Sequence, residues 1–191
     1  MITHVRIQLT RAEMEFAVGV GVQRSMDDIF AGCRDTYNLK VGMGWQCSIE
    51  GALGEQAVAK LLGVHWDGSI GNFAAKDVGA YQVRATARLD GRLILHPGDA
   101  DDDKWILVRG EAPNLIVGPW CYGREGKLQA DWSDPGKNGR PAFFVPRGIM
   151  RDIDSLTAAP GDPAGSSAPR SSQSQLFDDD FAGVTRDDII P

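Results

Sequence analysis

The sequence predicts an α/β domain, with a central mixed sheet flanked by helices, followed by a disordered tail. Two stretches near the N-terminus carry apolar residues at helical spacing, and the middle of the chain carries short runs that alternate apolar and polar residues. At Ala158 the composition changes to small, polar and proline residues that cannot bury a core. The 191 residues therefore divide into one domain, about residues 1–157, and a tail over residues 158–191.

The first helix is expected from about Arg11 to Cys33. The residues Thr-Arg-Ala-Glu at positions 10–13 form the capping-box pattern that begins a helix, and an apolar-periodic run follows them. Gly19 and Gly21 weaken this helix, because glycine has a low helix propensity. The next segment, Asp35 to Gln46, contains two further glycines and is expected to be a loop.

A second helix is expected from Ile49 to Leu62, with Ser48 as its N-cap and Gly63 at its end. A last helical turn is expected within Met150–Leu156. Between them the sequence predicts six strands: Val64–Trp66, Tyr81–Ala87, Arg92–His96, Trp105–Arg109, Leu115–Tyr122 and Ala142–Val145.

The stretch from Lys76 to Thr86 places Asp77 just ahead of a strand whose two faces differ. Successive side chains of a strand point to opposite faces. One face carries Tyr81, Val83 and Ala85, and the other carries Gln82, Arg84 and Thr86. An apolar face that packs, combined with a polar face that carries an amide and a guanidinium, indicates a site built on a sheet.

A helix glutamate precedes this strand, because residues 51–55 read Gly-Ala-Leu-Gly-Glu. The order of Glu55, Asp77 and then Gln82-Val83-Arg84 resembles the PD-(D/E)xK nuclease superfamily, also called restriction-endonuclease-like. Members of that family carry a helix glutamate, a strand aspartate and an acid-x-lysine pair. The resemblance covers about Ile49 to Leu95. It extends to small bacteriophage and prophage proteins with the same helix pattern, and it implies a restriction-endonuclease-like core.

The resemblance implies a DNA nuclease that depends on Mg²⁺ (or Mn²⁺) and acts in phage or bacterial DNA repair, recombination or replication. Phosphodiester hydrolysis of this kind uses a hard cation held by oxygen ligands. Asp77 is expected to bind the metal directly, and the Gln82 amide and the Val83 carbonyl to supply neutral oxygens. Glu55, or less favourably Glu50, completes the site.

Arg84 stands where the family has a lysine. Besides an active nuclease, two other interpretations of the protein are open. Arginine stays protonated and cannot be a general base, but it can hold a phosphate through two hydrogen bonds. The expected catalytic residues are Glu55, Asp77, Gln82 and Arg84. Alternatively, the protein is an inactive member of the fold that binds DNA or a sliding clamp and modulates host replication or defence. In the third hypothesis Asp77 only caps a turn.

The tail contains a peptide that resembles the bacterial sliding-clamp-binding motif, Gln173-Ser174-Gln175-Leu176-Phe177. Leu176 and Phe177 would fill an apolar pocket of the clamp, while Gln173 would form hydrogen bonds at its rim. The alternative is that this segment folds back onto its own domain.

DNA is the other expected partner, with Trp132, Lys137 and Arg140 in a predicted loop as the contact. Tryptophan can stack on bases, although a loop tryptophan can equally pack back on its domain. Trp66 and Trp105 are expected in the core. The net charge is −6, but the last 34 residues carry six acids and two bases, so the rest of the chain is nearly neutral and allows a local basic groove.

The sequence favours a cytoplasmic location, in a bacterium or an infected host cell. The three cysteines, Cys33, Cys47 and Cys121, are far apart, which argues for a reducing compartment and against a disulfide framework or a zinc knuckle. No secretory signal is visible at the N-terminus, and no run of eighteen apolar residues predicts a membrane helix.

Overall fold

The computed structural model describes residues 4–32, 43–68, 76–134 and 141–157. These residues belong to one compact unit, Met1–Ala158. The predicted clamp-binding peptide and two of the predicted DNA contacts, Lys137 and Arg140, lie outside the described residues.

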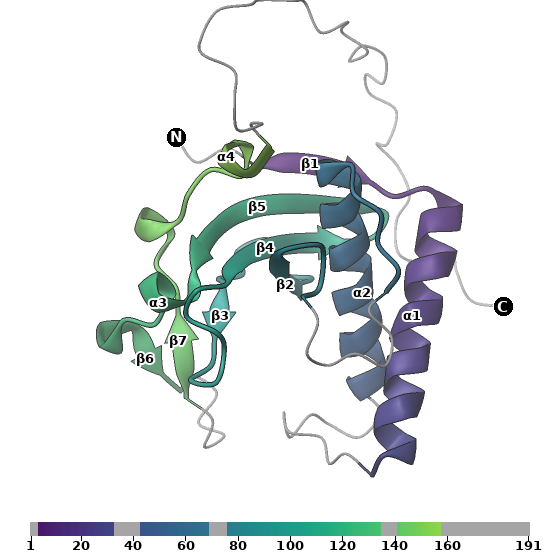
Figure 1. Ribbon diagram of the computed structural model, residues 1–191, viewed down its shortest axis with the longest axis horizontal. Coiled ribbons are helices and arrows are strands. Elements are labelled where there is room, and N and C mark those ends of the chain that lie inside the picture. Colours follow the sequence, from purple (N-terminus) through teal and green to yellow (C-terminus); the bar gives the residue numbers. More distant parts are fainter. Residues whose placement is uncertain (1–3, 33–42, 69–75, 135–140, 158–191) are drawn as a thin grey trace, which may run out of the picture. The chain divides into compact units, whose positions relative to one another are not determined.

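A four-stranded mixed sheet forms the centre of this unit, in the order β1-β5-β4-β2 (Figure 1). Its strands are β1 (Val5–Gln8), β2 (Tyr81–Thr86), β4 (Lys104–Glu111) and β5 (Asn114–Tyr122). β2 runs parallel to β4, whereas the other pairs are antiparallel. The predicted mixed sheet is therefore confirmed, and β2, which follows Asp77, is one of its two edge strands.

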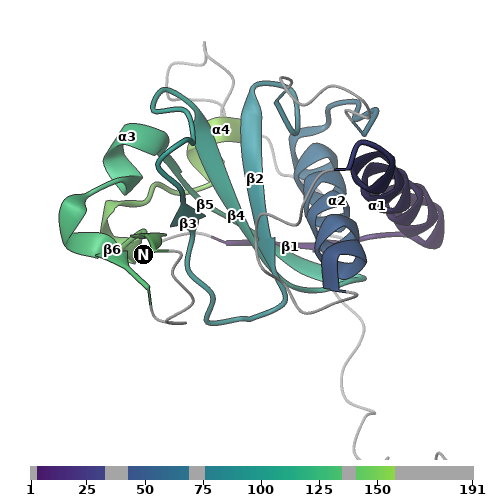
Figure 2. The ribbon, with the colours of Figure 1, turned by 90° about the horizontal axis from the view of Figure 1, so that it is seen from below.

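Two long helices lie on one face of this sheet, α1 (Arg11–Phe30) and α2 (Met43–Leu62). α2 packs on the strands, and α1 packs along the outer side of α2 (Figure 2). α1 begins at the predicted capping box, where the Thr10 hydroxyl accepts a hydrogen bond from the Glu13 N–H. α2 begins earlier than predicted, so the expected loop was wrong at residues 43–46. A single glycine, Gly44, costs a helix only about 1 kcal/mol and does not stop it.

The second face of the sheet is covered by a smaller antiparallel sheet in the order β3-β7-β6. Its strands are β3 (Ile94–Leu95), β6 (Trp132–Ser133) and β7 (Ala142–Phe144). Between the two sheets lies a buried cluster that includes Leu93, Leu95, Trp105, Leu107, Cys121, Val145 and Met150. The short helices α3 (Gly123–Gly126) and α4 (Asp154–Thr157) and two 3₁₀ turns (Gln129–Asp131, Arg147–Ile149) complete the fold.

The two faces of β2 are divided as its alternating sequence predicts. Val83 belongs to the core on the helix side, together with Ile106 and Val108 of β4. Gln82 and Arg84 are the register partners of β4 residues that belong to the opposite cluster. Partners in a parallel ladder point to the same face, so these two polar side chains face away from α2.

The strands of the structure differ from the predicted ones at Val64–Trp66 and at β1. Val64–Trp66 is not a strand; Trp66 is buried because it packs edge-on against Phe16 and its indole N–H donates to the Asp77 carbonyl at 3.0 Å. β1 was not predicted, because four residues give too short an alternation to recognise. The burial of Trp66 and Trp105, at 6% and 3% exposure, was predicted correctly.

The close approach of α2 to β2 depends on Gly54. A Cβ atom added at this position would lie 2.7 Å from the Cβ of Ala85, whereas one at Gly51 meets nothing within 4 Å. We expect Gly54→Ala to lower the free energy of unfolding by about 1–3 kcal/mol, because the helix must move away from the strand. Gly51→Ala should raise it by up to about 1 kcal/mol through helix propensity. Urea denaturation of both variants tests this, and equal effects would contradict it.

Candidate functional site

Glu55 and Asp77 are brought together on the helix side of β2. Glu55 projects from α2, and Asp77 lies just before β2. The two residues are close enough for the negative charge of Asp77 to contribute to raising the pKa of Glu55. Glu50, the weaker alternative, lies one turn earlier and accepts a hydrogen bond from Gln46 instead.

Glu55 forms a buried, two-pronged ion pair with Arg24 of α1. The Nη1 and Nη2 atoms of Arg24 each lie 2.7 Å from one of the two Glu55 carboxylate oxygens, and the Glu55 side chain is only 6% exposed. Arg24 also donates to the Gly68 carbonyl at 2.7 Å. This pair joins α1, α2 and the segment after α2, and it occupies both oxygens of the predicted catalytic glutamate.

The pKa values of both members of this pair are raised, but for different reasons. Burial, and secondarily Asp77, raise the pKa of Glu55 and outweigh the opposing effect of Arg24. The hydrogen bonds to Glu55 raise the pKa of Arg24, so the guanidinium remains charged. Arg24 is therefore the main group that favours the ionised form of the buried Glu55 carboxylate.

The Asp77 carboxylate is fixed against the edge of β2. Its Oδ2 accepts a hydrogen bond from the Val83 N–H at 2.7 Å. Burial raises the pKa of Asp77, while that hydrogen bond and the charges of Arg84 and Arg24 oppose the rise. The Val83 N–H therefore points away from β4. The carbonyl of a strand residue points to the same side as its N–H, so the Val83 carbonyl faces the same open edge as Asp77.

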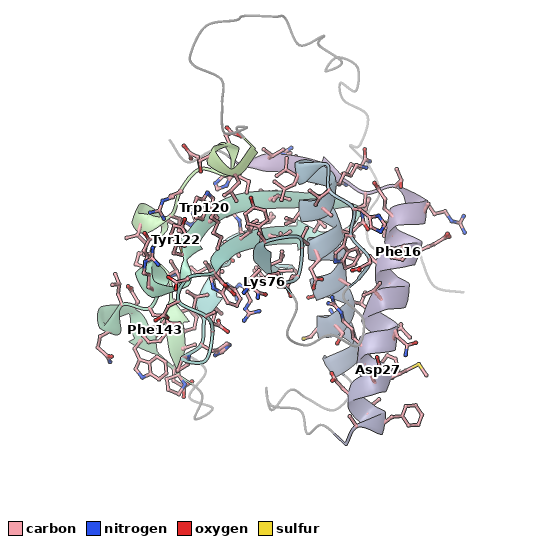
Figure 3. All side chains as sticks on the ribbon, in the orientation of Figure 1. Phe16, Asp27, Lys76, Trp120, Tyr122 and Phe143 are labelled. Atoms are coloured by element: carbon pink, nitrogen blue, oxygen red, sulfur yellow. The ribbon has the colours of Figure 1, made fainter. Side chains whose placement is uncertain are left out.

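Gln82 and Lys76 meet at Asp103, a residue that the sequence did not mark as part of the site. The Gln82 amide N–H₂ donates to Asp103 Oδ2 at 3.2 Å, and the Lys76 ammonium binds the same oxygen. Lys76 lies close to β2 in Figure 3. Asp103 also acts electrostatically on Asp77, whose pKa it helps to raise. The turn before β4 thus adds a third carboxylate to the surroundings of Asp77.

Arg84 is held by two partners on the second face of the sheet. Its Nη2 lies 3.0 and 3.2 Å from the two oxygens of Asp99, and its guanidinium lies 4.4 Å from the centroid of the Trp105 ring. Asp99 in turn accepts the His96 N–H at 2.9 Å. Arg84 is therefore an ordered cation, about one-third exposed, that already has a carboxylate partner.

These residues offer only a few carboxylate ligands to a divalent cation. Among residues 4–32, 43–68, 76–134 and 141–157, no group of three His, Cys, Asp or Glu side chains is placed to hold a metal ion. Mg²⁺ commonly keeps several waters and takes only one or two carboxylates from the protein. Asp77 and the Val83 carbonyl together match that smaller requirement.

The predicted DNA contact at Trp132 lies in β6 and not in a loop, because residues 132–133 pair with β7. The Trp132 ring lies 4.7 Å from the ring of Phe143, which Figure 3 labels. This is the arrangement of a tryptophan that packs back on its domain. Its contact with DNA stays a prediction.

The sequence marked Glu55, Asp77 and Arg84 as site residues. It missed four further charged residues around this site: Arg24, Lys76, Asp99 and Asp103. Arg24 lies in a helix with no strand pattern nearby, and its partner is 31 positions away. Three consecutive acids, Asp101-Asp102-Asp103, are typical of a solvated turn. Nothing in the local sequence shows which of its members turns towards β2.

Comparison with protein-family models, with curated proteins and with solved structures gave no match for this chain. The similarity to PD-(D/E)xK nucleases thus rests on the motif residues alone, and the restriction-endonuclease-like topology stays a prediction. In the part of the chain that the structure describes, no helix is both long and apolar enough to cross a bilayer.

Proposed function

We propose that this protein is a Mg²⁺-dependent DNA nuclease whose active site is centred on Asp77. The observation that carries the proposal is the placement of this carboxylate: largely buried, beside a second buried carboxylate, and fixed by the Val83 N–H. Such a placement is unfavourable for folding, since burial, and to a smaller extent the charge of Asp103, raise the pKa of Asp77. Groups with a pKa perturbed in this way concentrate at functional sites.

The proposed metal ligands are Asp77 and the Val83 carbonyl, with the Gln82 amide oxygen as a further candidate from the other face. When bound, the cation would stabilise charge on a phosphate oxygen and lower the pKa of a bound water. Glu55 stays paired with Arg24 and holds the helix in place beside Asp77. Arg84, anchored by Asp99 and Trp105, would contact a phosphate but cannot accept a proton.

The proposal is tested by incubating the protein with linear, nicked, branched and single-stranded DNA, with Mg²⁺ or Mn²⁺ and with a chelator as control. Cleavage that requires the metal is expected on at least one substrate. Activity that persists in the chelator would contradict the proposal.

A second candidate function is DNA or clamp binding without catalysis. It is favoured by the closed ion pairs of the site, because Glu55 and Arg84 each already have a charged partner. No cleavage of any DNA substrate, together with no Mg²⁺ or Mn²⁺ binding by calorimetry, would favour this candidate over the nuclease.

The sliding clamp is the proposed partner of the tail, through Gln173, Leu176 and Phe177. A synthetic peptide spanning residues 173–181 is expected to bind a bacterial clamp saturably in a fluorescence titration, because the two apolar side chains would fill its pocket. A peptide with Leu176→Ala and Phe177→Ala is the control. Equal binding of both peptides, or binding of neither, would contradict the proposal.

A further inference from the structure

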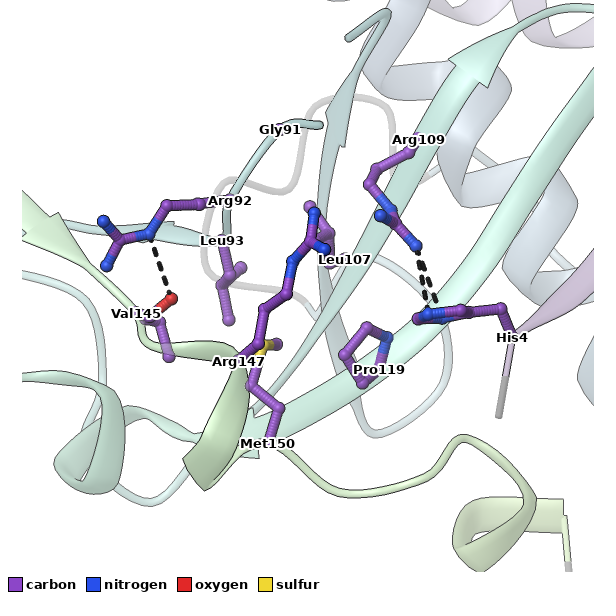
Figure 4. Close-up of a pocket in the computed structure, with 10 residues that line it drawn as sticks. All are labelled: His4, Gly91, Arg92, Leu93, Leu107, Arg109, Pro119, Val145, Arg147 and Met150. Atoms are coloured by element: carbon purple, nitrogen blue, oxygen red, sulfur yellow. Dashed lines mark hydrogen bonds between the residues drawn. The ribbon is translucent and has the colours of Figure 1, made fainter. Parts of the chain in front are cut away.

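A cavity of about 240 Å³ lies on the second face of the main sheet, away from Asp77 and Glu55. Leu107 and Arg109 of β4 form one wall, and Arg92 and Arg147 approach from the segments next to β3 and β7 (Figure 4). Leu107, Pro119 and Met150 make part of the lining apolar. Three arginines therefore line one small cavity.

Arg109 is buried in this wall without a carboxylate partner. The residue is 6% exposed. Its Nη1 donates to the Leu89 carbonyl at 3.0 Å, and its Nη2 lies 3.3 Å from the nearer ring nitrogen of His4. Its buried Nε has no hydrogen-bond partner. Among the residues described in the structure, no Asp or Glu forms an ion pair with Arg109.

The neighbours of Arg109 add positive charge. Burial, and secondarily the charge of Arg147, lower the pKa of Arg109. The Arg147 guanidinium donates a hydrogen bond to the Asp90 backbone carbonyl, at 3.5 Å. Burial and the charge of Arg109 lower the pKa of His4, so its ring is neutral at neutral pH. Two guanidinium groups thus share this region, and among the described residues no Asp or Glu forms an ion pair with either of them. The nearby acids act more weakly: the charge of Arg147 helps to lower the pKa of the exposed Asp90, and Asp152 acts on His4.

Arg92, on the far side of the cavity, is different. It donates to the Phe144 and Val145 carbonyls, and its Nη2 lies 3.7 Å from Asp131. Through these contacts Arg92 links the segment before β3 to β7 and the residue after it. Of the other two arginines, Arg109 is buried with an unpartnered Nε, and Arg147 is exposed and brings a second positive charge to the cavity.

We propose that this cavity binds a phosphate group, with Arg109 and Arg147 as its ligands. Two guanidinium groups match the oxygens of a phosphate dianion, which would supply a counter-charge inside the cavity. The cavity is smaller than the ~300–1,000 Å³ typical of sites for drug-sized ligands. It suits inorganic phosphate or the phosphate end of a larger molecule, with the apolar wall contacting the carbon next to it. The proposal does not depend on the nuclease activity.

The structural alternative is that Arg109 only ties β4 to the Leu89 loop and to His4. That role uses Nη1 and Nη2 of Arg109 but leaves its buried Nε without a partner, and in it Arg147 is an ordinary solvated arginine. The two interpretations differ in their response to phosphate, which makes them separable.

The test is calorimetric titration of the full chain with inorganic phosphate at neutral pH and low salt, supported by thermal unfolding with phosphate or with chloride at equal ionic strength. Saturable binding is expected, with a rise in Tm that chloride does not reproduce. Arg147→Gln and Arg109→Met should each weaken phosphate binding at least 10-fold. Without phosphate, Arg109→Met should keep or raise the Tm, since it removes an unpaired buried charge. Arg11→Gln, at an exposed arginine that pairs with Glu15 and does not line the cavity, is the matched control and should bind like the wild type.

Two further ligands identify the source of the phosphate, a nucleoside 5′-monophosphate and a single-stranded oligonucleotide. Arginine-dependent binding of either supports the site and assigns its source. The proposal is overturned if no phosphate ligand binds, or if binding is the same in wild type, Arg147→Gln and the Arg11→Gln control. If Arg109→Met does not fold, Arg147→Gln alone decides.

Discussion

Replacing Asp77 by asparagine is expected to abolish metal-dependent DNA cleavage while leaving the protein at least as stable as the wild type. Loss of hydrogen bonds around metal ligands typically costs 10–100-fold in affinity or activity, so loss of a direct ligand should cost more than about 100-fold. The asparagine carbonyl can still accept the Val83 N–H bond that now reaches Asp77 Oδ2. Cleavage rates and chemical denaturation measured on the same samples test both parts.

The pH dependence of stability provides a second readout for Asp77. Because burial raises the pKa of this group in the folded state, the folded protein holds its proton to higher pH than the unfolded chain does. Stability is therefore lost as pH rises from the unfolded value towards the raised folded value. In Asp77→Asn this part of the pH dependence should disappear. If Asp77 merely caps a turn, Asp77→Asn would instead leave the cleavage rate unchanged, and that result would remove Asp77 from the active site.

Replacing Arg24 by alanine is expected to cause the largest loss of stability, about 3 kcal/mol at neutral pH. The variant would leave the Glu55 carboxylate buried with no partner, and removing one member of a buried ion pair costs much more than the pair contributes. Arg11→Ala is the matched control in the same helix: Arg11 pairs with Glu15, but both side chains are exposed, and the loss should stay below about 1 kcal/mol.

Protonation of Glu55 should reduce the damage caused by Arg24→Ala. The pKa of Glu55 is already raised by burial, and loss of Arg24 removes an effect that lowers it. The deficit relative to wild type should therefore be smaller near about pH 5 than near about pH 8. Adding Glu55→Gln to Arg24→Ala should recover part of the lost stability. A deficit that does not change with pH and is not relieved by Glu55→Gln would show that Arg24 acts through packing alone.

Local patterns gave correct predictions where one element carries its own signal. The capping box placed the start of α1, and the alternation in β2 placed Val83 in the core and Arg84 on the opposite face. These signals arise from backbone hydrogen bonds and from the side-chain period of a strand, both of which involve neighbouring residues. β1 and the first turn of α2 were missed because short or glycine-containing elements depend on their packing partners.

The partners of the charged residues could not be derived in the same way. Arg24 and Glu55 are 31 positions apart, and Arg109 and His4 are 105 positions apart. Their meeting depends on how α1 packs on α2 and how β1 pairs with β5. An arginine in a helix and a histidine near the N-terminus have many possible partners, and the sequence does not choose among them.

By itself, the sequence determined the α/β class, the two-faced strand behind Asp77 and the change of composition at Ala158. The tertiary structure decided the partner of each charged side chain. Glu55 forms an ion pair with Arg24, and Arg84 forms one with Asp99, whereas Arg109 is buried without a carboxylate partner among the described residues. The physical reason is that a charge is stabilised or destabilised by its burial and its neighbours in space. Both are fixed only when helices and strands from distant parts of the chain pack together.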